Sequence, residues 1–90
     1  MRVALIARDK PGALETRLAN REAHLAYVKE TGVVEQAGPF LDADGQMSGS
    51  LLILSVDSMA DAEAWAADDP YAKAGLFDSV SLTEWNRVLG

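Results

Sequence analysis

Apolar positions along the chain follow two different periods. In four segments, aliphatic and β-branched residues run together or alternate, which predicts strands at residues 2–8, 33–42, 47–56 and 76–88. Elsewhere apolar residues recur every three or four positions, which predicts a helix over 13–31 and another over 60–67 that resumes briefly to residue 74. The predicted order is therefore β-α-β-β-α-β.

The first predicted helix carries apolar and polar side chains on neighbouring stripes. Its expected apolar stripe consists of Leu14, Leu18, Leu25 and Val28. Arg21 interrupts this stripe, and Arg17 and His24 lie along one edge of it. The helix is thus expected to present a polar seam where an ordinary amphipathic helix is apolar or fully exposed. Gly32 predicts its end.

Small and turn-forming residues constrain the two middle strands. Gly38-Pro39 inside the second strand requires a bulge, a bend or an edge position. Residues 42–45, DADG, predict a tight hairpin turn into the third strand. The second half of that third strand is apolar on both faces, which favours a central position. Its small residues Ser48-Gly49-Ser50 leave room for another group to approach the backbone closely.

This order of elements is typical of the ferredoxin-like α+β fold, an antiparallel four-stranded sheet with both helices on one face. Ninety residues suit a single domain spanning 1–90. A chain of this size buries only about 60–65% of its unfolded surface. Because nothing in the chain covers the other sheet face, we expect two copies to pack sheet to sheet as a barrel-like homodimer.

Composition narrows the range of partners. The net charge is −6 with eight basic residues, which argues against nucleic acid and against an anionic membrane surface. With no cysteine and one histidine, disulfides and thiolate chemistry are excluded, and neither a metal-ligand set nor a cofactor motif is evident. No apolar run has the length of a membrane helix or a signal segment. We therefore expect a cytoplasmic protein that binds no cofactor.

The segment Asp68-Asp69-Pro70-Tyr71 interrupts the second predicted helix and has two interpretations. Asp69 caps a short helix that begins at Pro70, or it is a fixed carboxylate facing a pocket. His24, the single histidine, is either an ordinary helix residue or a proton shuttle. A general base needs an orienting carboxylate, and the expected fold lays the two helices side by side, so Asp69 is the candidate partner of His24.

Three further residues are candidates for a binding site. A buried Arg21 requires an anion, either Asp69 or a carboxylate of a ligand, whereas a side chain that snorkels to solvent requires none. Tyr71 is either a packing aromatic or a phenol that faces a pocket. Ser50 follows a glycine, but no spacing marks it as an activated nucleophile.

Four segments in register resemble the YciI-related (YCII) family: ETRLANREAHLAYV at 15–28, AGP at 37–39, GS at 49–50 and AWAADDPYAKAGLF at 64–77. The resemblance implies a dimeric α+β barrel of ferredoxin-like protomers, with a His–Asp site that falls on His24 and Asp69. It also implies that Gly38-Pro39 and Gly49-Ser50 line the pocket. Some relatives in this barrel group are lactone isomerases or dehydrochlorinases that need no cofactor. The connection Asp42–Gln46 is shorter than in some members.

Two functions are consistent with these features. The first is a small cofactor-independent enzyme of isomerase or lyase type, with His24 as general acid/base and Asp69 holding its tautomer. Its substrate, a small anionic or aromatic-derived molecule, is expected to contact Arg17, Arg21, Gly38, Pro39, Ser50 and Tyr71. The second is a non-catalytic dimeric module that binds a small ligand or uses the same pair only for stability.

Overall fold

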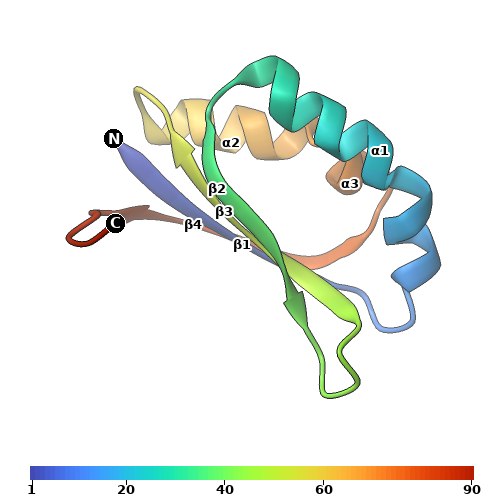
Figure 1. Cartoon of the computed structure of the whole chain (residues 1–90). Helices are drawn as coiled ribbons and strands as arrows, with labels where there is room; N and C mark the ends of the chain where they lie inside the picture. Colours follow the sequence, from blue (N-terminus) through green and yellow to red (C-terminus); the bar gives the residue numbers. More distant parts are fainter.

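Four strands form one antiparallel sheet in the order β2-β3-β1-β4, and the helices cover one of its faces (Figure 1). The computed structural model describes all residues from Met1 to Gly90. The strands are β1 (Arg2–Asp9), β2 (Val34–Leu41), β3 (Met47–Ser55) and β4 (Phe77–Trp85). The helices are α1 (Leu14–Thr31), α2 (Met59–Asp68) and α3 (Pro70–Lys73). The predicted order and the ferredoxin-like arrangement are both confirmed.

The core lies between the sheet and the helices. Leu5 of β1 pairs with Leu52 of β3 on one side and with Leu82 of β4 on the other, so a row of leucines crosses the sheet. The alternation along β1 turns Val3, Leu5 and Ala7 toward the helices, and all three are buried. Ala62 and Trp65 of α2 pack against this row and complete the cluster.

The face that α1 turns toward the sheet differs from the predicted one. Leu18 and Leu25, expected in the apolar stripe, are 54% and 46% exposed. The buried residues of α1 are instead Arg17 and His24, which lie about two turns apart on one face. Two stripes of similar width compete on this helix, and the polar one is buried because carboxylates from other elements meet it, as described below.

The small residues of the middle strands act largely as predicted. Gly38-Pro39 lies in β2, which is an edge strand, and the register shifts of β2 against β3 fall elsewhere. The edge position accommodates the proline, because one side of an edge strand has no partner strand to bond. A Cβ atom on Gly49 would collide with the backbone carbonyl of Ala7, which confirms the close backbone approach predicted for this segment.

Two helix starts in the second half of the chain are capped by side chains. The Ser58 hydroxyl accepts a hydrogen bond from the Asp61 N–H at the start of α2. Asp69 has extended backbone angles and caps α3 in the same way. In β4, Leu82 pairs with Leu5 on the helix side of the sheet, whereas Trp85 pairs with Arg2 on the opposite face.

The second face of the sheet carries no helix. Ile53 of β3 points to this side and is buried, whereas Ala4 and Ile6 of β1 and Leu51 of β3 point to the same side and are half-buried or exposed. No element of the chain covers them (Figure 1). The sheet-to-sheet homodimer therefore remains a prediction. None of the helices is long and apolar enough to cross a membrane.

Candidate active site

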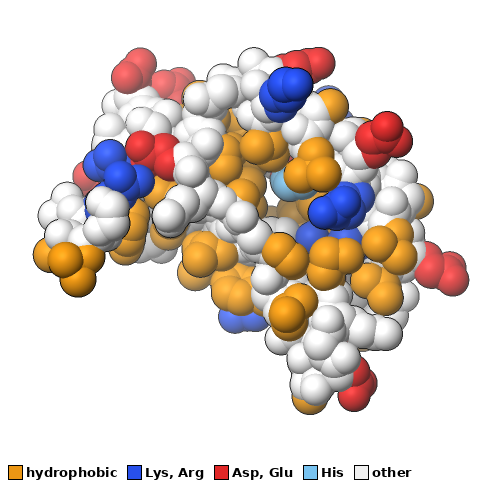
Figure 2. Space-filling view, viewed as in Figure 1, with side chains coloured by type: hydrophobic (Ala, Val, Ile, Leu, Met, Phe, Trp, Pro, Cys, Tyr) orange, Lys and Arg blue, Asp and Glu red, His pale blue; other side chains and the backbone are white.

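A small cavity lies between α1 and the β2–β3 edge of the sheet, on the helix side. Its volume is about 160 Å³, and it is lined by Arg17, Arg21, His24, Leu25, Ala37, Gly38, Pro39, Met47, Ser50, Leu52 and Tyr71. Figure 2 shows the histidine inside a hollow bordered by apolar side chains, with basic side chains beside it. All six residues that the sequence assigned to substrate binding line this cavity, together with His24.

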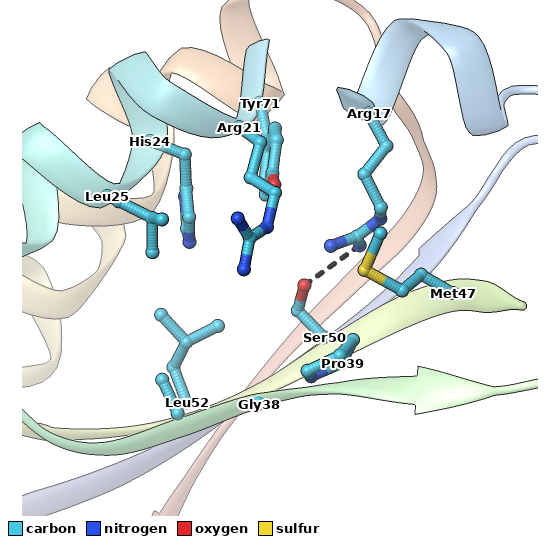
Figure 3. Close-up of a pocket in the computed structure, with 11 residues that line it drawn as sticks. Arg17, Arg21, His24, Leu25, Gly38, Pro39, Met47, Ser50, Leu52 and Tyr71 are labelled. Carbon is cyan, nitrogen blue, oxygen red and sulfur yellow. Dashed lines mark hydrogen bonds between the residues drawn. The ribbon is translucent and has the colours of Figure 1, made fainter. Parts of the chain in front are cut away.

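His24 projects from α1 into the cavity (Figure 3) and is 6% exposed. Its Nδ1 atom lies 2.8 Å from Oδ1 of Asp69, so the two candidate residues meet although they are far apart in sequence. Its Nε2 atom has no hydrogen-bond partner, while every fully buried side-chain nitrogen or oxygen in the protein has one. Nε2 is therefore the ring nitrogen that remains accessible from the cavity.

Asp69 is 1% exposed and does not itself line the cavity. Its Oδ1 atom accepts the backbone N–H of Tyr71 at 3.0 Å, which caps α3, and the same atom meets His24. The two interpretations of Asp69 are therefore compatible, because one oxygen both caps α3 and meets His24. The backbone N–H thereby fixes the carboxylate behind the imidazole, with Pro70 setting the first turn of α3.

Arg17 makes three hydrogen bonds to two other side chains. Nε and Nη2 donate to the two oxygens of Asp9 at 2.7 and 2.9 Å, and Nη2 also donates to the Ser50 hydroxyl at 2.9 Å. Both members of the ion pair are buried. Burial works to lower the pKa of Arg17, but the hydrogen bond and charge of Asp9 outweigh it and raise the pKa above its usual value.

Asp9 is a site residue that the sequence analysis missed. The signal was present in the alternation of β1, because the period that buries Val3, Leu5 and Ala7 also turns Asp9 toward the helices. The strand predicted from the sequence ends at residue 8, so Asp9 lies outside it. Without Asp9, a guanidinium on the buried face of α1 has no apparent counter-charge.

Tyr71 is both a packing aromatic and a pocket phenol. Its ring stacks on the imidazole of His24, with centroids 4.0 Å apart and planes 13° from parallel, and the guanidinium of Arg17 lies 4.7 Å from the ring centroid. Burial raises the pKa of the Tyr71 hydroxyl, partly offset by the nearby charges of Arg17 and Arg21. The hydroxyl is therefore protonated at neutral pH.

Arg21 reaches the cavity without being buried. It is exposed and makes no ion pair, so of the alternatives left open by the sequence the contact with Asp69 does not form and no buried guanidinium has to be neutralised here. In Figure 3 its guanidinium lies beside the His24 ring and lines the cavity. Arg21 is thus an unpaired cation next to the open nitrogen of His24.

The other walls of the cavity are mostly apolar or small. Gly38 and Pro39 of the edge strand form the side opposite His24. Sequence reasoning missed Leu25, Ala37, Met47 and Leu52, which give this wall its apolar character. Leu25 was assigned to the core stripe, and its position one residue after His24 on α1 was the available signal. No three His, Asp or Glu side chains cluster as a group that could hold a metal ion.

Comparison with known proteins decides the family. The model of the YCII-related domain matches residues 1–86 of the chain. The chain belongs to the YCII-related family. Among curated relatives, the Escherichia coli protein YciI is 35% identical, and the match covers 98% of this chain and 99% of the relative. A Haemophilus influenzae protein of unassigned function is 34% identical over the same shares of the two chains. The family resemblance found in the sequence is confirmed.

Solved structures support the same fold. The dehydrochlorinase TftG of Burkholderia phenoliruptrix, which acts on 5-chloro-2-hydroxyhydroquinone and was solved with 2,5-dihydroxybenzoquinone, is 34% identical with a TM-score of 0.89. The match covers 96% of this chain and 94% of that one. A putative antibiotic biosynthesis monooxygenase of Nitrosomonas europaea matches at 16% identity and a TM-score of 0.57, which shows a shared fold only.

Proposed function

We propose that this protein is a cofactor-independent acid/base enzyme that acts on a small anionic, ring-shaped molecule. The observation that carries the proposal is the state of His24: one ring nitrogen is held by a buried carboxylate, and the other opens into a cavity. A histidine with a purely structural role gains nothing from an open nitrogen, whereas a proton shuttle requires one.

His24 and Asp69 have distinct roles in this proposal. The Nε2 atom takes a proton from a ring hydroxyl of the substrate and returns it to a ring carbon. Where that carbon bears chlorine, a second hydroxyl then gives up its proton and the C–Cl bond breaks, so that chloride leaves with the bonding electron pair and a quinone forms. Asp69 accepts a hydrogen bond from Nδ1–H, which keeps Nε2 unprotonated in the neutral ring, and it stabilises the imidazolium formed during the transfer. Because the chemistry consists of proton transfers, it needs neither a metal nor a redox cofactor.

Size and charge of the cavity limit the substrate. A volume of about 160 Å³ is below the roughly 300 Å³ at which pockets for drug-sized ligands begin, so a single ring is the appropriate size. Arg21 supplies an unpaired positive charge beside apolar walls. The dehydrochlorinase TftG acts on a chlorinated hydroxyhydroquinone. By its similarity to that enzyme, we propose a hydroxylated or chlorinated ring as the substrate.

The test uses 5-chloro-2-hydroxyhydroquinone as the probe and chloride release as the readout. The wild-type protein should release chloride, and His24→Gln should lower kcat by about 100- to 10,000-fold, the usual contribution of a general acid/base. Glu30→Gln, a change on the exposed side of the same helix, serves as the matched control and should leave kcat unchanged. If His24→Gln retains kcat within about twofold of wild type, a general acid/base role for His24 is wrong.

A second outcome of the same experiment favours the alternative function. If the wild-type protein binds 2,5-dihydroxybenzoquinone in a spectroscopic titration but turns over neither this compound nor the chlorinated probe, the site is a binding module for small rings. The arrangement around His24 then positions a ligand instead of moving its protons.

We also propose that the protein assembles as a homodimer through the uncovered face of the sheet. Ala4, Ile6 and Leu51 form an apolar surface on the two central strands there, and Leu51 is 38% exposed. A second copy presents the same surface to it, as a twofold interface requires. Light scattering should give twice the mass of the chain, and Leu51→Lys should give the mass of one chain. A wild-type protein that remains monomeric at high concentration rejects the dimer.

A further inference from the structure

The hydroxyl group of Tyr71 has no use in the mechanism described so far. The residue is 2% exposed, yet its hydroxyl makes no close hydrogen bond, and the neighbouring Arg17 guanidinium can only donate to the phenol oxygen, which leaves the O–H proton unused. Since every fully buried side-chain nitrogen or oxygen has a partner, this hydroxyl is not fully buried. Tyr71 lines the cavity, so the small exposed part of its side chain opens there. An otherwise buried phenol thus presents an unused donor to the proposed substrate site.

The stacking of Tyr71 on His24 fixes where this donor lies. The two rings are nearly parallel at a centroid distance of 4.0 Å, and in Figure 3 both extend from the helices toward the same cavity. Their polar ends therefore face neighbouring atoms of one small ligand and not its opposite ends. Arg17 on the Tyr71 ring and Asp69 on His24 hold the two rings in place.

The charges around Tyr71 suit a proton donor. Burial raises the pKa of its hydroxyl, so the group carries its proton at neutral pH. The nearby cations Arg17 and Arg21 act in the opposite direction and favour the phenolate once the proton has left. The hydroxyl therefore holds a proton at rest and has positive charge nearby when it gives that proton up.

We propose that Tyr71 is a second catalytic residue, whose hydroxyl donates to a carbonyl oxygen of the substrate while Nε2 of His24 takes a proton from the adjacent carbon. The inference rests on the proposed function, because it assumes that His24 is the base. It adds a second group to that function and a definite reaction: the interconversion of a ketone with its enol.

Every atom and electron pair in this step is accounted for. The C–H bond breaks and its proton passes to Nε2 of His24, while the electron pair of that bond forms a carbon–carbon double bond. The π electrons of the carbonyl move to its oxygen, which takes the proton of the Tyr71 hydroxyl and becomes an enol. In the reverse direction the imidazolium returns a proton to carbon and Tyr71 recovers its own from the enol. No oxidant, reductant or co-reactant is consumed.

This pairing of donor and base names a class of substrate. A carbonyl oxygen and the hydrogen on the neighbouring carbon are separated by three bonds, which suits two groups held side by side. Together with the apolar wall and the cation Arg21, the site fits a small cyclic ketone, or its enol, with one negative charge. A hydroxylated aromatic ring is the enol form of such a ketone.

The experiment measures exchange of carbon-bound hydrogen with solvent. The probe is 4-oxocyclohexane-1-carboxylate in D₂O, and proton NMR follows the loss of the hydrogens next to its carbonyl. Wild-type protein should accelerate this exchange, and Tyr71→Phe should lower the rate at saturating probe by about 100-fold, within the range for one proton-transferring group. The KM for the probe should change by less than about threefold, because the aromatic ring and its stacking are retained.

Tyr27→Phe is the matched control, since it removes a phenol that lies outside the cavity and donates to the Trp65 carbonyl. It should exchange the probe at the wild-type rate. A Tyr71→Phe protein that retains the wild-type NMR dispersion and the wild-type exchange rate overturns the inference, and so does a wild-type protein that causes no exchange. If Tyr71→Phe is slow but His24→Gln exchanges at the wild-type rate, His24 is not the base and the proposed function fails as well.

Discussion

Helix α1 buries two polar side chains about two turns apart, and both meet a carboxylate from another element. Arg17 donates three hydrogen bonds to Asp9 and Ser50. His24 makes one hydrogen bond, to Asp69, and leaves its second ring nitrogen open to the cavity. The first pair is closed by its protein partners, whereas the second keeps a reactive atom available.

On this single helix face, the two pairs therefore have different roles, one structural and one chemical. The Arg17–Asp9 pair joins α1 to the end of β1 and places a cation against the Tyr71 ring. The His24–Asp69 pair joins α1 to the start of α3 and aims one nitrogen at a ligand. A buried ion pair fixes geometry, but only a pair with an unused atom offers it to a substrate.

The strongest test of this comparison is to remove one member of each pair and to measure both stability and activity. Arg17→Met should lower the free energy of unfolding by about 3–5 kcal/mol, because it leaves the buried Asp9 without its counter-charge. His24→Gln should lower it by less than half as much and should instead lower kcat by about 100- to 10,000-fold. Urea denaturation of both variants measures the first quantity and chloride release the second. Equal losses of stability would remove the distinction between the two pairs.

Asp69 permits a finer separation, because one oxygen serves both of its contacts. Asp69→Ala removes the cap of α3 and should cost about 1–2 kcal/mol of unfolding free energy. Asp69→Asn keeps an amide oxygen in the same position, so it should retain most of the stability and lose activity with the charge that stabilises the imidazolium. In Asp69→Asn the kcat should therefore fall while the midpoint of thermal unfolding changes little. In Asp69→Ala both should fall. An Asn variant with full activity would limit Asp69 to the role of a cap.

Arg21 differs from Arg17 in being exposed and in making no ion pair, so its loss should affect binding more than stability. Arg21→Met should change the free energy of unfolding by no more than about 0.5 kcal/mol, as expected for an exposed residue without an ion pair. It should weaken binding of the anion 4-oxocyclohexane-1-carboxylate by about tenfold, equivalent to roughly 1.4 kcal/mol. Calorimetric titration measures the affinity. Unchanged affinity would mean that Arg21 contributes no charge recognition.

The smallest expected effect is a loss of stability at alkaline pH. Burial raises the pKa of Tyr27, assisted by the charges of Asp68 and Asp69, and burial also raises the pKa of Tyr71. Both phenols hold their protons more tightly in the folded chain than in the unfolded chain. Their contribution to folding stability is therefore complete below the unfolded pKa of about 10 and declines as the pH rises through the pKa values of the folded protein. Urea unfolding between pH 8 and 11 should show this decline, and it should be weaker in Tyr27→Phe.

Much of the fold could be predicted from local patterns in the sequence. The hairpin turn at Asp42–Gly45, the Ser58 cap and the edge position of Gly38-Pro39 each depend on residues close together in the chain. The pairing of His24 with Asp69 was predicted from the family resemblance together with the expected position of the helices. In each case the decisive information is local, or follows from the order of the elements.

The orientation of α1 could not be predicted in the same way. Leu18 and Leu25 offer an apolar face, and the cost of burying Arg17 and His24 argues for that face. The opposite orientation is adopted because Asp9 and Asp69 neutralise the polar face, and both belong to other elements. A helical wheel contains no information about such partners. For the same reason the single shared oxygen of Asp69 lay beyond sequence reasoning.

The most direct test of the central claim is the tautomer of the single histidine. Nitrogen-15 NMR of the neutral imidazole reports separately whether Nδ1 or Nε2 carries the proton. In the wild-type protein the proton should lie on Nδ1, held by Asp69, with Nε2 unprotonated and free to act as the base. Asp69→Ala should lose this preference. A wild-type ring protonated on Nε2 would contradict the account, because the nitrogen facing the cavity would then be unable to accept a proton.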